Sequence, residues 1–109
     1  MAQQAATVVM EGVQVIQGTP SKPLRGPTLF LKMWKVIRPP EPDVTLASLC
    51  MARPGTDGYI IKDLIPELTC RPKEALDKAV AIANRGDVSE VYVNADMEKL
   101  PGLGFAEVG

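Results

Sequence analysis

Residues 72–85 have the apolar spacing of a helix that packs one side against another layer of structure. The apolar positions recur at i, i+3, i+4 and i+7, at Leu76, Ala79, Val80 and Ala83. Pro72 suits the first helical position, and Gly86 suits a left-handed residue just past the last turn. The many alanines favour close contact with a sheet. We therefore predict a helix over about residues 72–85, with Leu76 and Val80 nearly fully buried.

The segments around this helix favour strands. The β-prone runs are residues 7–17, 28–38, 44–53, 59–64 and 88–94. In the first run, Gly12 is expected to produce a bulge that shifts the apolar face. Between the third and fourth runs, Pro54-Gly55 and Asp57-Gly58 predict a hairpin turn. Pro66 is expected to lie past the end of the fourth run, because proline interrupts the hydrogen bonds of a strand.

Residues 28–38 fit either a strand or a helix. A helix would gather Leu29, Phe30, Met33, Trp34 and Ile37 on one face, opposite the cations. A strand would separate Leu29, Leu31, Met33 and Ile37 from Phe30, Lys32, Trp34, Val36 and Arg38. We adopt the strand, because aromatic and β-branched residues favour it. Its second face then carries two aromatic residues between cations and needs a cover.

Together these segments predict an α+β fold in which residues 1–109 form a single domain. The expected order is strand, strand (or helix), strand, strand, helix, strand, with the helix on one face of a small mixed or antiparallel sheet. Residues 18–27 contain three prolines and two glycines and are expected to form an irregular loop. Residues 95–109 are expected to form an irregular tail that is held by apolar anchors.

The net charge of −1 conceals an uneven distribution. Residues 1–40 carry one acidic and five basic residues, a net charge of +4, whereas residues 41–109 carry twelve acidic and seven basic residues, a net charge of −5. A basic segment on an acidic body can bind a polyanion, its own body or a second copy. We favour the two self-complementary alternatives, because five cations are few for nucleic-acid binding.

Several classes of function are excluded or disfavoured by what the sequence lacks. The chain has no histidine, which excludes Ser-His-Asp and Cys-His nucleophilic sites and zinc sites that need imidazole. It has no phosphate-binding glycine motif, and we predict no metal and no cofactor. We expect no membrane-spanning segment, no secretory signal and no disulfide framework, because no apolar run is long enough to span a bilayer, the first residues lack a cationic and a long apolar segment, and there are two cysteines. We therefore expect a cytoplasmic protein with reduced thiols and no membrane partner.

Cys70 is the candidate catalytic residue. It precedes the predicted helix and is followed by Arg71, and both a helix N-terminus and a neighbouring cation can activate a thiol. The alternative is a structural cysteine that closes the loop before the helix. Cys50, between Leu49 and Met51, is expected to be a small core residue.

The apolar and basic residues around Trp34 form the main candidate binding site. The expected interface residues are Phe30, Met33, Trp34 and Val36. The expected contacts with a polyanion are Arg25, Lys32, Lys35 and Arg38. Our leading hypothesis is a small non-catalytic binding protein that forms a homodimer through Trp34 and its neighbours. The alternatives are a nucleic-acid-binding accessory protein that uses the cations of residues 22–38, and a small enzyme with Cys70 at the edge of a pocket.

Overall fold

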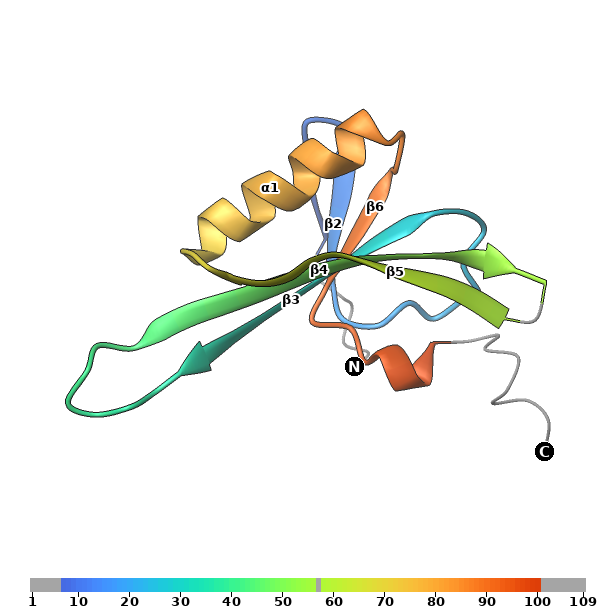
Figure 1. The fold of residues 1–109 in the computed structure, drawn as a ribbon. Helices are drawn as coiled ribbons and strands as arrows, with labels where there is room; N and C mark the ends of the chain where they lie inside the picture. The colour runs from blue at the N-terminus through green and yellow to red at the C-terminus, as the bar shows by residue number, and fades with distance from the viewer. Residues whose placement is uncertain (1–6, 57, 101–109) are drawn as a thin grey trace, which may run out of the picture.

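A mixed sheet of six strands with one α-helix on one face makes up the part of the chain that the computed structural model describes, residues 7–56 and 58–100 (Figure 1). In chain order the elements are β1 (Thr7–Met10), β2 (Val13–Gln17), β3 (Thr28–Val36), β4 (Val44–Gly55), β5 (Gly58–Thr69), α1 (Pro72–Arg85), β6 (Glu90–Val93) and the short 3₁₀ helix η1 (Met97–Lys99). Across the sheet the strands follow the order β1-β2-β6-β3-β4-β5. The predicted α+β class is confirmed, whereas the predicted order had one strand too few before the helix.

The missing strand comes from the first β-prone run, which forms a hairpin instead of one bulged strand. β1 pairs antiparallel with β2, and Met10 opposite Val13 closes a turn of two residues. These two residues, Glu11 and Gly12, have φ angles of 51° and 85°, the left-handed values that a tight type I′ hairpin turn needs. The prediction of a bulge at Gly12 is therefore wrong. Glutamate gives no sign of such a turn, because it is not a residue that favours positive φ.

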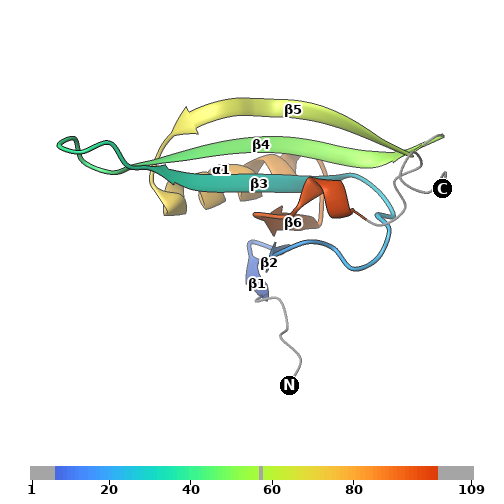
Figure 2. The same cartoon turned by 90° about the horizontal axis from the view of Figure 1, so that it is seen from below.

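The predicted strand over residues 28–38 is observed near the middle of the sheet, but it ends two residues earlier, at Val36. β3 pairs antiparallel with β4 along its whole length, and on its other side it pairs with β6. β6 lies between β2 and β3 and is parallel to both, an arrangement that requires crossover connections. α1 connects β5 to β6 on one face of the sheet, and residues 18–27 connect β2 to β3 across the other. Figure 2 shows α1 behind the strands and η1 in front of them.

β4 and β5 form a hairpin that is longer than predicted. β5 continues through Pro66 to Thr69, although the sequence predicted an end before Pro66. β5 lies at the edge of the sheet, where a residue without an N–H group is tolerated. Residues 47–50 of β4 pair with residues 63–68 of β5, so β5 holds two extra residues in successive register shifts. Asp57 of the predicted turn lies outside the described residues.

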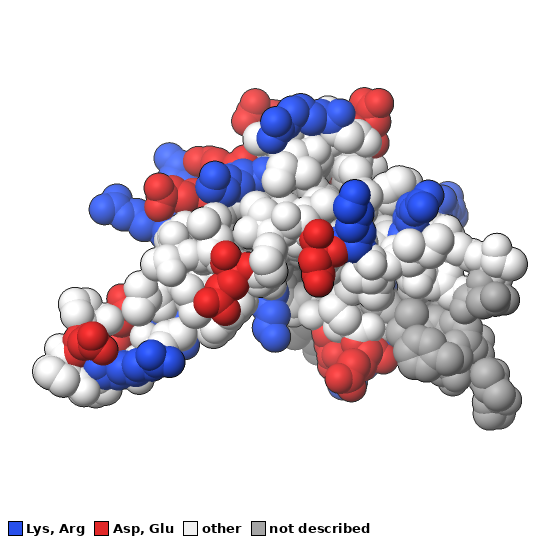
Figure 3. Space-filling model, in the orientation of Figure 1, with Lys and Arg blue, Asp and Glu red and all other residues white. Residues whose placement is uncertain are grey.

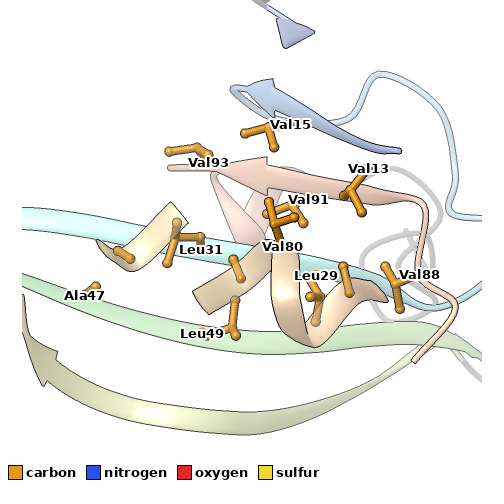
Figure 4. Close-up of a cluster of buried hydrophobic side chains, with 13 residues drawn as sticks. Val13, Val15, Leu29, Leu31, Ala47, Leu49, Val80, Val88, Val91 and Val93 are labelled. Carbon is orange, nitrogen blue, oxygen red and sulfur yellow. The ribbon is translucent and has the colours of Figure 1, made fainter. Parts of the chain in front are cut away.

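The main core lies between α1 and the sheet (Figure 4). Its largest fully buried side chains are Leu29, Val13, Val80, Val91 and Val93. Successive side chains of a strand point to opposite faces, so the central strands direct every second residue at α1. The helix has the predicted bounds, and the backbone N–H of Arg71 donates to Oε1 of Glu74 at 2.9 Å at its start.

Alanines set the position of α1 over the sheet. Ala75, Ala79 and Ala83 are at most 2% exposed, and their small side chains let the helix backbone approach the strands. Val80 is fully buried, as predicted. Leu76 is half-buried, so the prediction of nearly full burial is wrong for this residue. The row of alanines, and not the larger Leu76, forms the centre of the buried face.

The end of α1 differs from the prediction by one residue. Gly86 has a φ of −102°, and its N–H donates to the carbonyl oxygen of Ile82 at 3.0 Å. Asp87 instead takes the positive φ, at 56°, and the N–H of Val88 donates to the carbonyl oxygen of Ala83 at 2.8 Å. Aspartate tolerates this conformation because its short polar side chain can bond locally, and the chain turns there towards β6.

The difference in burial between Val80 and Leu76 has a measurable consequence. Val80→Ala should lower the free energy of unfolding by about 2–3 kcal/mol, since it removes fully buried carbon atoms and leaves a cavity. Leu76→Ala should cost about 1 kcal/mol, because part of its side chain is already in water. Urea unfolding followed by circular dichroism measures both. A larger loss of unfolding free energy for Leu76→Ala than for Val80→Ala would contradict this assignment of the buried helix face.

The β1–β2 turn can be improved by a single substitution. Glu11→Asn should raise the free energy of unfolding by about 0.5–1 kcal/mol, because asparagine tolerates the φ of 51° better than glutamate. Glu11→Val is the opposite control, since a β-branched residue is strained at positive φ. Urea unfolding of the two variants should place them on either side of the wild type. Equal stability of both variants would contradict the left-handed turn.

Candidate interaction surface

We call the sheet face opposite α1 the open face. A second core covers one part of it. It consists of residues that are at most 9% exposed, namely Leu24, Phe30, Ala52 and Leu100. The rings of Phe30 and Tyr92 stack with their centroids 5.8 Å apart. The N–H of Leu24 donates to Oη of Tyr59 at 3.0 Å, which holds the crossover loop onto the sheet.

The loop and the tail contribute to this cover without regular strands. Residues 18–27 contain no helix or strand, and Leu24 anchors them. From the predicted tail, the described part contains η1 and the buried Leu100. Residues 101–109 of that tail lie outside the described residues.

Beyond the second core, the open face carries a row of three cross-strand pairs that we call the Trp34 patch. The pairs are Lys32–Ser48, Trp34–Leu46 and Val36–Val44. Trp34 and its apolar neighbours are half-buried, apart from Val44, which is 41% exposed. The Lys32 ammonium lies 5.7 Å from the centre of the Trp34 ring, a cation–π contact. The patch therefore combines partly exposed apolar side chains with one cation.

The four residues predicted as an interface are not all on one surface. Phe30 belongs to the second core and is 4% exposed. Met33 packs against the main core on the α1 side, and its N–H donates to Oδ1 of Asn94 at 2.8 Å. Trp34 and Val36 lie together in the Trp34 patch.

Leu46 and Val44 complete the patch from β4 and were not singled out in the sequence. Their position beside β3 depends on the register of two strands that are joined by residues 37–43. A connection of this length does not define a register through a turn type, as a two-residue hairpin does. No local signal therefore links these residues to Trp34.

Residues 37–43 form the end of an arm that projects from the body of the molecule (Figure 1). Ile37 is 63% exposed, and the N–H of Glu41 donates to the carbonyl oxygen of Arg38 at 2.9 Å. A hollow of about 430 Å³, which we call the arm hollow, is lined by Val36, Arg38, Glu41, Pro42, Asp43 and Val44. Two of these residues, Val36 and Val44, also belong to the Trp34 patch, so the hollow is continuous with the patch.

The four cations predicted to contact a polyanion are spread over the molecule. Arg25 lies in the crossover loop, Lys32 in the Trp34 patch and Arg38 at the arm hollow. Lys35 is exposed on the face opposite Trp34, because neighbouring residues of β3 alternate. Acidic and basic side chains are interspersed over the face shown in Figure 3. These four cations therefore do not form one continuous track for a phosphate backbone.

A larger cleft, of about 630 Å³, lies between the crossover loop and the start of β6. The loop contributes Lys22 and Arg25 to its lining, and the β6 side contributes Asp87 and Glu90. Tyr92 also lines the cleft, and burial, followed by the negative charge of Glu90, raises the pKa of its hydroxyl. Because the lining carries both signs of charge, it does not select a ligand of one sign.

Both cysteines are free thiols and half-buried. Cys70 packs against the main core just before α1, and its N–H donates to the carbonyl oxygen of Thr45 at 3.1 Å. A catalytic role for Cys70 stays a prediction. Cys50 lies beside the second core and opposite Asp63, and burial, followed by the Asp63 carboxylate, raises the pKa of its thiol. Within residues 7–56 and 58–100, no group of three or more His, Cys, Asp or Glu residues is placed to hold a metal ion.

Similarity to known proteins adds nothing to these observations. Comparisons with protein-family models, with curated proteins and with solved structures find no match to this chain. In the described part of the chain, no helix is both long enough and apolar enough to cross a membrane. A function therefore has to be derived from the residues themselves.

The raised pKa of the Cys50 thiol predicts slow alkylation near neutral pH. In a Cys70→Ser variant, Cys50 is the one cysteine that can react. Its labelling by iodoacetamide should accelerate at a higher pH than the labelling of an ordinary thiol, because the reactive thiolate forms at a higher pH. Adding Asp63→Asn should move this onset to lower pH, because the change removes a negative charge that opposes the thiolate. Mass spectrometry of samples quenched over a series of pH values measures the rates. Rapid labelling at neutral pH without the Asp63 change would contradict this environment.

Proposed function

We propose that this chain is a small non-catalytic interaction protein that works as a homodimer, with the Trp34 patch as its dimer surface. The observation that carries the proposal is the position of Trp34, which lies half-buried beside Leu46 on the open face and outside both cores. Tryptophan at the centre of an apolar surface is the residue most often found to dominate the binding energy of an interface.

A second copy of the patch suits the first in polarity. In a dimer with a two-fold axis the same surface is used by both copies, so the apolar row of one meets the apolar row of the other. Removing the exposed parts of Trp34, Leu46 and Val44 from water stabilises such a pair. Lys32, at the margin of the patch, can cover apolar surface with its carbon chain while its ammonium stays in water.

Catalysis has weaker support from the same structure. A nucleophilic site needs an activated nucleophile with a base beside it. Cys70 packs against the main core, and the raised pKa of the Cys50 thiol is the opposite of activation.

Nucleic-acid binding is the alternative that the contact between Lys32 and Trp34 supports, since an aromatic ring flanked by a cation can stack on a base. The distribution of Arg25, Lys35 and Arg38 over separate regions weakens it. It is one of the outcomes of the following test.

Light scattering and a Trp34 variant test the proposal directly. At tens of micromolar protein, multi-angle light scattering should give twice the chain mass of 11.7 kDa. Trp34→Ala should raise the dimer Kd by on the order of 30-fold or more, because each dimer loses two central indole rings. Sedimentation equilibrium of both proteins measures the two constants.

Ile60→Ala is the control for loss of an exposed apolar side chain outside the patch. Ile60 is 49% exposed on β5, and its replacement should leave the Kd unchanged. A wild-type protein that stays monomeric at these concentrations would overturn the proposal. Salt-sensitive retention of RNA or DNA that Trp34→Ala abolishes would instead support the nucleic-acid alternative.

A further inference from the structure

We infer that the arm hollow of each copy receives Trp34 of the other copy. The Lys32 that accompanies this ring then lies beside Glu41 and Asp43 of the copy whose hollow is filled. The inference rests on the proposed function and adds to it the orientation of the two chains. Three properties of the arm support it, namely the location of the hollow, its lining and its charge.

The arm hollow lies next to Trp34 and is left unfilled by it. The inner wall of the hollow is the Val36–Val44 pair, which follows the Trp34–Leu46 pair along the hairpin. Two residues along a strand cover about 7 Å. Trp34 is not among the residues that line the hollow, so the indole ring of the same chain does not occupy it.

The lining of the hollow suits an aromatic ring with a cation at its edge. Val36, Pro42 and Val44 supply apolar walls. A volume of about 430 Å³ lies within the range of pockets that take small organic groups, and an indole ring is smaller than most of these. Contact with these walls would remove part of the ring from water, which contributes to the binding energy of a tryptophan at an interface.

The charges on the two sides of this contact are complementary. Two carboxylates, Glu41 and Asp43, and one guanidinium, Arg38, line the hollow and give it a net charge of −1. The Lys32 ammonium lies over the Trp34 ring, so it would accompany the ring to the hollow. The ion pair formed within the described residues joins Lys99 to Asp96, and it uses none of these four groups. All four remain available to a second copy.

Two-fold symmetry makes the contact reciprocal. When Trp34 of one copy enters the hollow of the other, the rotation places the second Trp34 in the first hollow. Because ring and hollow are neighbours on one face, the axis passes between them. The two arms then point in opposite directions and lie across each other's open face. Each dimer contains two ring contacts and two sets of opposite charges.

A charge exchange tests this orientation. Lys32→Glu and the double variant Glu41→Lys with Asp43→Lys each bring like charges together, and each should raise the Kd about tenfold or more, since the contact occurs twice. In an equimolar mixture of the two variants, a heterodimer regains opposite charges at both contacts. Its Kd should therefore lie within about threefold of the wild-type value. Sedimentation equilibrium gives the constants, and native mass spectrometry identifies the heterodimer.

Lys35→Glu is the matched control, because it makes the same charge change one residue pair away from the hollow but on the opposite face of β3. It should leave the Kd unchanged, and urea unfolding checks that every variant is folded. If Trp34→Ala weakens the dimer while the charge variants and their mixture do not differ from the wild type, the proposed function stands and this orientation is wrong. Equal effects of Lys32→Glu and Lys35→Glu would also overturn the orientation. A monomeric wild type would overturn both proposals.

Discussion

The burial of β6 between two parallel neighbours is the constraint on which the rest of the structure depends. Val91 and Val93 point towards α1 and are fully buried, while Tyr92 points to the open face and stacks on Phe30. Because β6 is parallel to both β2 and β3, the chain has to cross the sheet twice. One crossing contains α1 and the other is formed by residues 18–27, and they cover opposite faces. The two crossings that the parallel pairing of β6 requires therefore also form the covers of the main core and the second core.

Features with a local signal were predictable from the sequence, and features of pairing were not. The helix bounds follow from Pro72 and the spacing of small apolar residues, and the β3 strand follows from its aromatic and β-branched residues. Glu11 carries no signal for positive φ, so the first hairpin was missed. Pro66 predicts the end of a strand, because proline is tolerated within a strand mainly at the edge of a sheet. That β5 lies at the edge is a property of the whole sheet and has no local signal.

The candidate site shows the same division between local and distant information. Side chains alternate along β3, so Met33 and Trp34 lie on opposite faces of the sheet. The predicted interface contained both residues and therefore could not form one surface. The cover over Phe30 comes from Leu24 and Leu100, which are distant from each other in the chain, and no spacing pattern connects them. The Trp34 patch lies on the open face beyond this cover. The position of its β4 residues beside Trp34 depends on the register between β3 and β4.

The edge of the sheet at β5 has a further consequence for how molecules of this chain behave when crowded together. An exposed edge strand with a regular ladder can recruit strands from other molecules and grow into filaments. Along the twelve residues of β5, Pro66 removes one backbone donor and two register shifts displace others. An incoming strand would therefore meet an interrupted row of donors and acceptors along residues 63–68. This protection is confined to the second half of β5, because residues 58–63 keep a regular register with β4 and carry Ile60 and Ile61, each 49% exposed.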